Sequence, residues 1–338
     1  MNPILGTISL KSQGNESPYS SYFLKTMFGI SSLPKNGLHV TGDPHTFNEL
    51  APEYTEGNSV SGAQKKLFMS LDDGVLIPVK KNGQYIVKPA PKEFAHLPEN
   101  EHCIMQLAKA VGFNVAANAL VPFESGELAY VTKRFDMHKN GQRFFIEDAA
   151  SLCLVAPVNK GSDALSYEQT LNTLFSVSGQ NRGVSLNGFL QVLFAYIVGN
   201  NDLHLKNLSL FREPNSHSHI MTNFTPLYDV LSVAPYPSYF SEDLTLCLLQ
   251  SEVDAKFSAA YDLYGYYTEH DFIVFGQQIG LSLNATKSSI KKLCMKVEQT
   301  YKYIIDASQC PNNMKLIIKS HIADRLNRML RSYPLDEG

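Results

Sequence analysis

The sequence predicts an α+β protein in two parts, a β-rich part over residues 1–147 and a helical part over residues 148–338. Short apolar or alternating runs, bounded by Asn-Gly pairs and prolines, fill residues 67–146 and are typical of strands. Apolar residues then recur at helical spacing over much of residues 167–330. A chain of 338 residues is long enough for one large or two ordinary domains.

The composition excludes several classes of protein. Lys and Arg total 29 against 32 Asp and Glu, and no run of like charges stands out, so direct nucleic-acid binding is not expected. The five cysteines contain no Cys-x-x-Cys pair, which indicates buried thiols in a reducing compartment rather than disulfides or a zinc site. Apolar runs are too short to span a bilayer, and no signal peptide begins the chain. We therefore expect a cytoplasmic protein that does not associate with a membrane.

Residues 1–57 are polar and rich in turn-forming residues, and only residues 19–30 are apolar enough to pack. The loop that follows, residues 57–66, is rich in backbone N–H groups and closes with two lysines, so it can hold phosphates. Its Gly-x-x-x-x-Gly spacing is that of a P-loop, but Ala63 and Gln64 stand where that motif requires Lys and Ser or Thr. A P-loop is therefore excluded, and an ordinary hydrophilic connector is the alternative to a phosphate loop.

A sheet that carries one helix is expected next. The predicted strands cover residues 67–71, 76–79, 85–88, 118–123, 128–135 and 143–146. Asn82-Gly83 favours a hairpin between the second and third strands. The predicted helix covers residues 98–110, because Pro98 suits a first turn and Gly112 ends the pattern.

Two charged residues of this part match positions used by protein kinases. Lys88 ends a strand that follows the phosphate loop, where kinases place the lysine that pairs with nucleotide phosphates. Glu101 lies in the first turn of the predicted helix and can meet Lys88, as the kinase helix glutamate does. The alternatives are an exposed lysine at a strand end and an acid that interacts with the helix dipole.

The remaining chain is predicted to be largely helical. The expected helices cover residues 167–177, 185–198, 254–266, 269–279, 285–307 and 312–330. A strand is expected over residues 208–211. The polar stretch between the second helix and this strand, residues 199–210, is where we expect a catalytic loop.

The catalytic stretch, residues 199–210, places an acid, an imidazole, a lysine and an amide within six residues: Asp202, His204, Lys206 and Asn207. Four residues separate Asp202 from Asn207, which is the interval in the kinase catalytic loop. Asp229 follows Asn207 by 22 residues and is flanked by apolar residues, so it is a candidate second metal carboxylate. The alternative is that these residues cap a helix and form a turn, as Asn and Asp often do.

Taken together, the motifs resemble those of the HipA-like serine/threonine kinase toxins of bacterial toxin–antitoxin systems. The matching motifs are residues 59–65, 85–89, 99–101, 131–136, 147–148, 199–207 and 227–232. They occur in the family's order and cover roughly residues 57–335. The resemblance implies a bilobal protein-kinase-like fold with a β-rich N-terminal lobe and a helical C-terminal lobe, and an enzyme that uses ATP and Mg²⁺.

The resemblance also implies roles for the residues of the catalytic stretch. Asp202 would be the catalytic base or orient the substrate, and Asn207 and Asp229 would bind Mg²⁺. Lys206 would offset phosphate charge in the transition state. His204 matches a loop position, and we expect it to have a structural role.

The nucleotide site implied by the resemblance uses residues of the N-terminal part. Lys88 would pair with the phosphates and Glu101 with Lys88, while the backbone at Glu147 would bind adenine. The loop around Gly62 would cover the phosphates, and its hydroxyls on Ser59 and Ser61 would be autophosphorylation sites. Longer members of the family more often have Ala at the position of Ser61. A phosphate there would place close to two negative charges beside the triphosphate and weaken nucleotide binding.

Longer members of the family carry an additional β-rich subdomain before the serine loop, so the chain resembles the short, HipT-like variety of a three-gene HipBST-like system. The expected partners are a small HipS-like antitoxin that resembles the missing subdomain and a helix-turn-helix, HipB-like DNA-binding protein. The expected substrate is an aminoacyl-tRNA synthetase, tryptophanyl or glutamyl, whose phosphorylation inhibits translation and arrests growth. Two alternatives remain, an aminoglycoside-type small-molecule phosphotransferase and a non-catalytic nucleotide-binding regulator.

Overall fold

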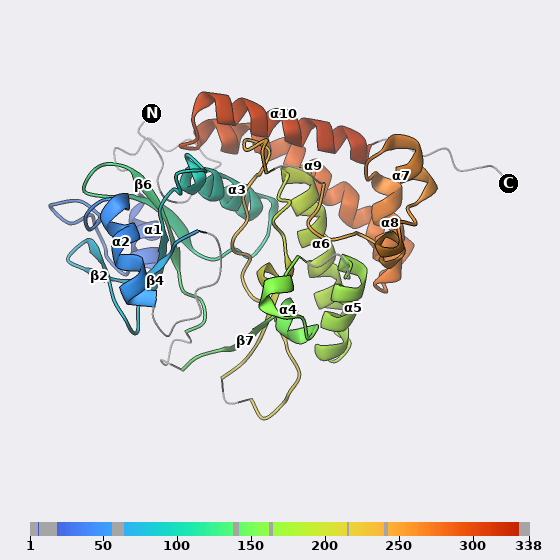
Figure 1. Cartoon of the computed structure of the whole chain (residues 1–338), viewed down its shortest axis with the longest axis horizontal. Coiled ribbons are helices and arrows are strands. Elements are labelled where there is room, and N and C mark those ends of the chain that lie inside the picture. The colour runs from blue at the N-terminus through green and yellow to red at the C-terminus, as the bar shows by residue number, and fades with distance from the viewer. Residues whose placement is uncertain are drawn as a thin grey trace. The chain divides into compact units, whose positions relative to one another are not determined.

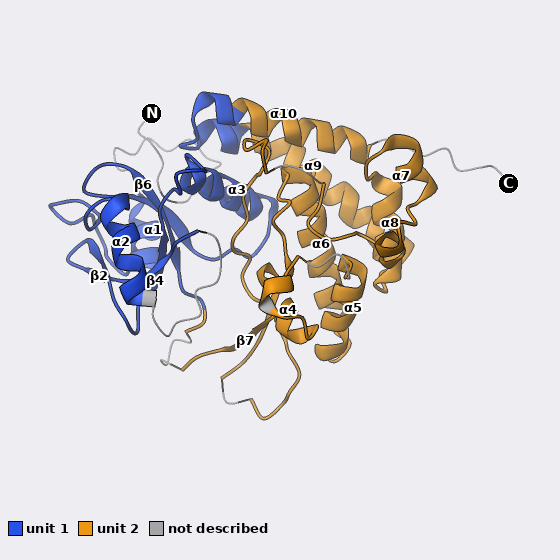
Figure 2. Cartoon of the chain, viewed as in Figure 1, with its two compact units in different colours: residues 1–135, 303–315 blue, residues 136–302, 316–338 orange. Residues whose placement is uncertain are grey.

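The computed structural model describes residues 6, 19–55, 64–137, 142–161, 165–214, 216–239 and 243–330. Its contacts divide the chain into two compact units, shown in different colours in Figure 2. The first unit comprises Met1–Phe135 and Tyr303–Lys315, and the second comprises Asp136–Lys302 and Leu316–Gly338. Sheet-rich structure in the first and helices in the second match the predicted α+β class (Figure 1).

A mixed sheet forms the centre of the first unit. Within the described residues its strands are β1 (His39–Val40), β2 (Leu67–Asp72), β3 (Val75–Pro78), β4 (Tyr85–Lys88), β5 (Asn118–Pro122) and β6 (Leu128–Lys133). Their order is β1-β3-β2-β4-β6-β5, with β1 parallel to β3 and the other pairs antiparallel. The predicted strands from residue 67 to residue 135 are confirmed, each to within two residues.

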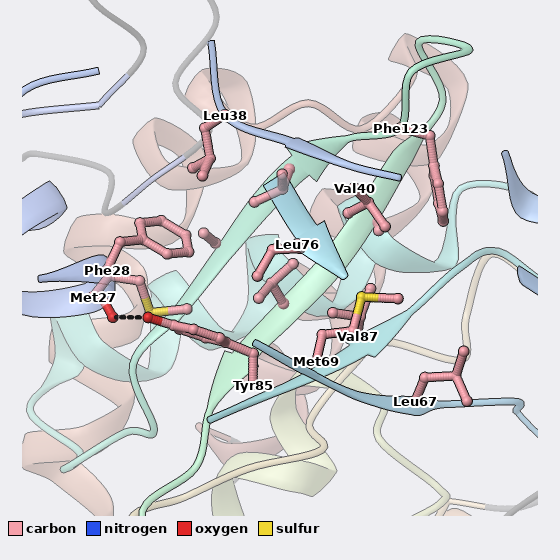
Figure 3. Packing of buried hydrophobic residues seen from close by; sticks show 14 of the residues in the cluster. Met27, Phe28, Leu38, Val40, Leu67, Met69, Leu76, Tyr85, Val87 and Phe123 are labelled. Carbon is pink, nitrogen blue, oxygen red and sulfur yellow. Dashed lines mark hydrogen bonds between the residues drawn. The ribbon is translucent and has the colours of Figure 1, made fainter. Parts of the chain in front are cut away.

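Two helices that the sequence analysis did not predict, α1 (Ser21–Phe28) and α2 (Pro44–Thr55), contribute to the core of this unit. The Ser20 side chain accepts from the Phe23 N–H at the start of α1, and Gly29 ends the helix at φ +74°. Figure 3 shows the apolar side chains of this core packed together, with the Tyr85 hydroxyl donating to the Met27 carbonyl at 3.2 Å. Burial of these aromatic side chains stabilises helices that a polar, turn-rich sequence conceals.

The predicted helix over residues 98–110 is confirmed as α3 (Leu97–Val111), which contacts β5 and β6. Almost all of its residues are buried, including polar ones. Gln106 Nε2, for example, donates to Asn118 Oδ1 of β5 at 2.9 Å. Because the helix is buried on more than its apolar face, Glu101 is held inside the unit rather than in solvent.

The second unit is largely helical. Its described helices are α4 (Ala149–Leu152), α5 (Tyr167–Val177), α6 (Arg182–Val198), α7 (Ala259–Tyr264), α8 (Glu269–Gln278), and the parts of α9 (Leu283–Ala307) and α10 (Asn312–Met329) that belong to it. Short 3₁₀ turns occur at η1 (Pro157–Asn159), η2 (Leu205–Asn207) and η3 (Gln250–Asp254). The single helix predicted over residues 254–266 is wrong, because Ala255 adopts φ +57° and ends η3, and Ser258 starts α7 separately.

A small antiparallel sheet completes the second unit, with the described order β7 (Phe145–Asp148), β8 (Ser209–Arg212), β9 (Asn223–Phe224). Helix α6 is buried along most of its length, and its Phe189 and Tyr196 rings pack against Phe275 and Phe272 of α8. The buried helix and β8 fix the two ends of the catalytic stretch. No helix in the described parts of the chain combines the length and apolarity needed to cross a membrane.

Candidate active site

The catalytic stretch starts where α6 ends, at Gly199. This residue adopts φ +71°, and its N–H bonds back to the last turn of the helix. A Cβ at this position would lie 2.6 Å from Nε2 of His321, on α10. The Gly199 carbonyl accepts from the Val233 N–H at 2.8 Å. Left-handed backbone and the close imidazole both require glycine here, so the entry to the stretch is fixed.

Asp202 lies in an exposed turn whose backbone is held internally. Its carbonyl accepts from the His204 N–H at 2.8 Å and from Asn207 Nδ2 at 3.1 Å. The neighbouring Leu203 and Leu205 side chains are buried. Hydrogen bonds and buried neighbouring side chains therefore hold the turn on both sides of Asp202, which is itself exposed.

The His204 imidazole is influenced by two acidic residues of the predicted site. Burial lowers the pKa of its imidazole, while the charges of Asp202 and Asp229 act in the opposite direction and Lys160 adds to the lowering. Both carboxylates therefore lie close enough to influence the same ring, although 26 residues separate them in sequence. The lowered pKa keeps the imidazole neutral near pH 7, which is consistent with the structural role expected for it.

Asp229 adopts φ +59°, a left-handed conformation that is unusual for a residue other than glycine. Such a conformation costs about 1 kcal/mol or more and is found most often at functional sites. The next residue, Val230, is buried, and the preceding residue, Tyr228, is tied to the catalytic stretch. The surrounding contacts thus hold Asp229 in a conformation that its own backbone disfavours.

Tyr228 is a positioning residue that the sequence analysis quoted in a motif but gave no role. Its hydroxyl donates to the Lys206 carbonyl at 2.8 Å, and the Ser209 hydroxyl, 2.7 Å away, donates to it. The residue before Asp229 therefore holds the backbone between Lys206 and β8. Its only sequence signal was its place beside Asp229.

Further anchors come from parts of the chain that are distant in sequence. The Tyr167 hydroxyl of α5 donates to the Leu203 carbonyl, and the Thr245 hydroxyl donates to the Asn201 carbonyl, each at 2.6 Å. The Leu205 N–H donates to the Lys160 carbonyl at 3.1 Å. No local pattern in the sequence indicates these contacts.

The donor groups of Asn207 and Asp229 are of the types that bind a magnesium ion arriving with a nucleotide. Among the described residues there is no group of three or more His, Cys, Asp or Glu that could hold a metal. Mg²⁺, however, is usually bound by one or two carboxylates together with substrate phosphates. Asn207 uses its Nδ2 on the Asp202 carbonyl, which orients its amide oxygen as an acceptor, and Asp229 supplies a carboxylate.

In the first unit, Lys88 and Glu101 form a buried ion pair. Lys88 Nζ lies 2.8 Å from Glu101 Oε1, and the side chains are 9% and 0% exposed. Nζ also lies 5.5 Å from the centre of the Tyr130 ring. The strand lysine and helix glutamate that the sequence analysis singled out thus meet, and their role toward a nucleotide stays a prediction.

The structure describes only some of the other predicted nucleotide-binding residues. Glu147 lies in β7, opposite Leu210 of β8, at the edge of the described small sheet. Ser59, Ser61 and Gly62 lie outside the described residues. In the described part of that loop, Gln64 Nε2 donates to the Pro89 carbonyl at 2.8 Å.

Comparison with known proteins identifies relatives of this chain. Residues 58–301 match the model of the HipA-like C-terminal domain family. A putative kinase of Haemophilus influenzae is 33% identical over 308 residues, which cover 82% of this chain and 88% of that protein. The serine/threonine-protein kinase toxin HipA of Shewanella oneidensis is 27% identical over 269 residues, covering 73% of this chain and 57% of the toxin.

Solved structures show the same fold. HipA of Shewanella oneidensis, solved in a complex with HipB and operator DNA, matches with a TM-score of 0.63 at 24% identity, over 80% of this chain and 65% of that one. The proinflammatory kinase CtkA of Helicobacter pylori matches with a TM-score of 0.52 at 15% identity, over 81% and 91% of the two chains.

Proposed function

Because the chain belongs to the HipA-like C-terminal domain family, we propose that it is a serine/threonine protein kinase that uses ATP and Mg²⁺. The observation that carries the proposal is the exposed, pinned turn at Asp202. Asn207 follows five residues later and binds its carbonyl, and Asp229 acts on the same imidazole as Asp202. Kinases need this combination of a carboxylate, an amide and a second carboxylate, because phosphoryl transfer depends on positioning and charge neutralisation.

In the proposed reaction the substrate hydroxyl oxygen attacks the γ-phosphorus, the bond to the β-phosphate oxygen breaks, and ADP leaves. Asp202 accepts the hydroxyl proton or orients the hydroxyl for attack. Lys88 pairs with the nucleotide phosphates, and Lys206 offsets charge that develops on the transferred group. Asn207 and Asp229 would hold magnesium, whose charge would help to neutralise that of the phosphates.

The proposed biological role is that of a growth-arresting toxin in a HipBST-like system. It is supported by the relative that is named a HipA kinase toxin, of which this chain covers 57%. The proposed substrate is a tryptophanyl- or glutamyl-tRNA synthetase, whose phosphorylation would stop aminoacylation. The proposed partners are a small HipS-like antitoxin and a DNA-binding protein similar to the HipB with which the Shewanella HipA was solved.

Regulation by autophosphorylation is part of the proposal. Ser59 and Ser61 lie in the loop that precedes β2, and a phosphate on either would repel a nucleotide triphosphate. Incubation with Mg-ATP is expected to add one or two phosphates to the intact chain by mass spectrometry. The Ser59→Ala/Ser61→Ala variant should gain none, and phosphate elsewhere on that variant would contradict the assignment.

The kinase proposal is tested by phosphate transfer from Mg-ATP to purified bacterial aminoacyl-tRNA synthetases. The wild type is compared with Asp202→Asn and with the control Asp262→Asn, which changes an exposed aspartate of α7. Transfer by the wild type and the control alone supports the proposal and identifies the target. Autophosphorylation without transfer to any synthetase would keep the kinase and reject the substrate. Absence of both would favour a regulator without kinase activity.

A further inference from the structure

An apolar segment, residues 152–158, runs from the last residue of α4 into η1 in the second unit, and its Leu154, Ala156 and Val158 are exposed. No charged residue occurs from Ser151 to Asn159. The Leu154 side chain is 93% exposed and that of Val158 is 87% exposed, the highest values among the large apolar residues of the described chain. Two such side chains four residues apart, in a stretch without charge, offer apolar atoms in solvent that another apolar group can cover.

The backbone at Leu154 is unfavourable for a leucine. Val155 N–H bonds to the Ala150 carbonyl at 2.8 Å and Leu154 N–H to the Ser151 carbonyl at 3.1 Å, which is the hydrogen-bonding pattern of a Schellman motif. Leu154 occupies the left-handed position of that motif, at φ +58°, where glycine is the usual residue. The sequence therefore keeps a bulky side chain at a position where it strains the backbone and is left in solvent. Backbone strain of this kind is a reason to ask what the exposed leucine side chain does.

The segment is anchored to the catalytic stretch. Two residues after Val158, the Lys160 carbonyl accepts from the N–H of Leu205, three residues beyond Asp202, at 3.1 Å. Helix α4, from which the segment leaves, contacts η2 of the catalytic stretch. The next residue, Gly161, faces Thr245, whose hydroxyl donates to the Asn201 carbonyl. The backbone that follows the apolar segment is thus hydrogen-bonded to the backbone that follows Asp202.

We propose that Leu154 and Val158 form a specificity site that binds an apolar side chain of the protein substrate, close in sequence to the phosphorylated serine or threonine. The proposal rests on the proposed kinase function. A protein that presents a hydroxyl to exposed Asp202 brings its flanking residues to the adjoining surface. Because residues 152–158 carry no charge, the surface favours an aliphatic or aromatic flanking residue over an acidic or basic one.

The test uses a library of serine-centred peptides in which one flanking position at a time is fixed, with Mg-ATP as phosphate donor. Uptake of phosphate by the chain itself is measured in the same reactions. The wild type is compared with Leu154→Ser/Val158→Ser. The matched control is Leu263→Ser/Leu316→Ser, which changes leucines of α7 and α10 that are 61% and 65% exposed.

The wild type and the control are expected to select an apolar residue at one or more flanking positions. The double variant should lose about 10-fold or more in kcat/KM for those peptides, the scale of discrimination that a hydrophobic contact gives. Autophosphorylation of the double variant and its kcat/KM for peptides without the apolar residue should not change. Leu154→Gly separates binding from folding, because glycine suits φ +58° and should not lower the melting temperature while the preference weakens.

Three results would overturn the inference. They are transfer to peptides without an apolar preference, an unchanged preference in the double variant, and phosphate uptake by the chain with no transfer to any peptide. Each of these leaves the proposed kinase function in place. Absence of phosphate transfer to both peptides and the chain would overturn the kinase function and the inference together.

Discussion

Replacement of Lys88 by methionine should destabilise the chain by an amount that depends on pH. Lys88 Nζ lies 2.8 Å from Glu101 Oε1, and the Glu101 side chain is 0% exposed. Methionine fills a similar volume but leaves the carboxylate without this cation. A buried carboxylate that loses its cation either stays charged at high cost or takes up a proton.

Protonation sets an upper limit on the destabilisation. With an unfolded-state pKa of about 4.3, protonating a glutamate at pH 7 costs about 3.7 kcal/mol, and at pH 5 about 1 kcal/mol. The variant's folded-state pKa at Glu101 is raised, so its stability relative to the wild type falls as pH rises above about 4.3. We expect Lys88→Met to lose up to about 3.7 kcal/mol at pH 7 and about 2.6 kcal/mol less than that at pH 5.

The assay is urea unfolding at pH 5 and pH 7, followed by circular dichroism because the chain contains no tryptophan. The control is Lys88→Met/Glu101→Met, which removes both charges and should recover most of the loss, since apolar replacements of buried ion pairs are often neutral. Both variants should lack phosphate transfer. An equal loss of stability at the two pH values, or no recovery in the double variant, would refute a charge-based explanation.

Three further perturbations have outcomes set by the structure. Gly199→Ala should lower the melting temperature more than Gly265→Ala, because both glycines have φ near +70° but only the first added Cβ meets an imidazole, at 2.6 Å; equal effects would contradict this. Tyr228→Phe should lower kcat with little change in melting temperature, and unchanged kinetics would remove its positioning role. Burial lowers the pKa of His102 to about 4, so stability should fall as pH drops below 6.5, by about 2 kcal/mol at pH 5. In urea unfolding, the His102→Gln variant should lack this part of the loss of stability at low pH.

The elements that the sequence predicted correctly have local signals. Asn82 adopts φ +59° in the connection before β4, a conformation that Asn tolerates, but the hairpin predicted between β3 and β4 is wrong, because β2 lies between these strands and pairs with both. Helix α3 ends at Gly112, whose φ of +110° suits glycine best. Such signals depend on a few neighbouring residues, so they can be recognised without knowledge of tertiary contacts.

The helices that the sequence analysis missed depend on contacts between distant residues. The Phe47 ring of α2 packs against Phe123, and the Tyr19 hydroxyl beside α1 donates to the Leu120 carbonyl of β5. The Ala255 break is a similar case, because alanine favours helix and no local residue signals its left-handed conformation. Tertiary packing overrides weak local preferences at these places.

The catalytic stretch shows the same division between chemical groups and their supports. Its candidate chemical groups were proposed from residue type and spacing, whereas its supports act on backbone carbonyls and come from far along the chain. The carbonyls of Asn201, Leu203 and Lys206 accept from Thr245, Tyr167 and Tyr228 respectively.

Each supporting hydroxyl binds the backbone carbonyl of the residue that it holds rather than that residue's side chain. In the proposed reaction the carboxylate of Asp202 and the amine of Lys206 would act on the substrate while the supports hold the backbone beneath them, which is the arrangement that preorganised catalysis requires. It follows that substitutions at the supports should alter turnover through geometry, and substitutions at Asp202 through chemistry.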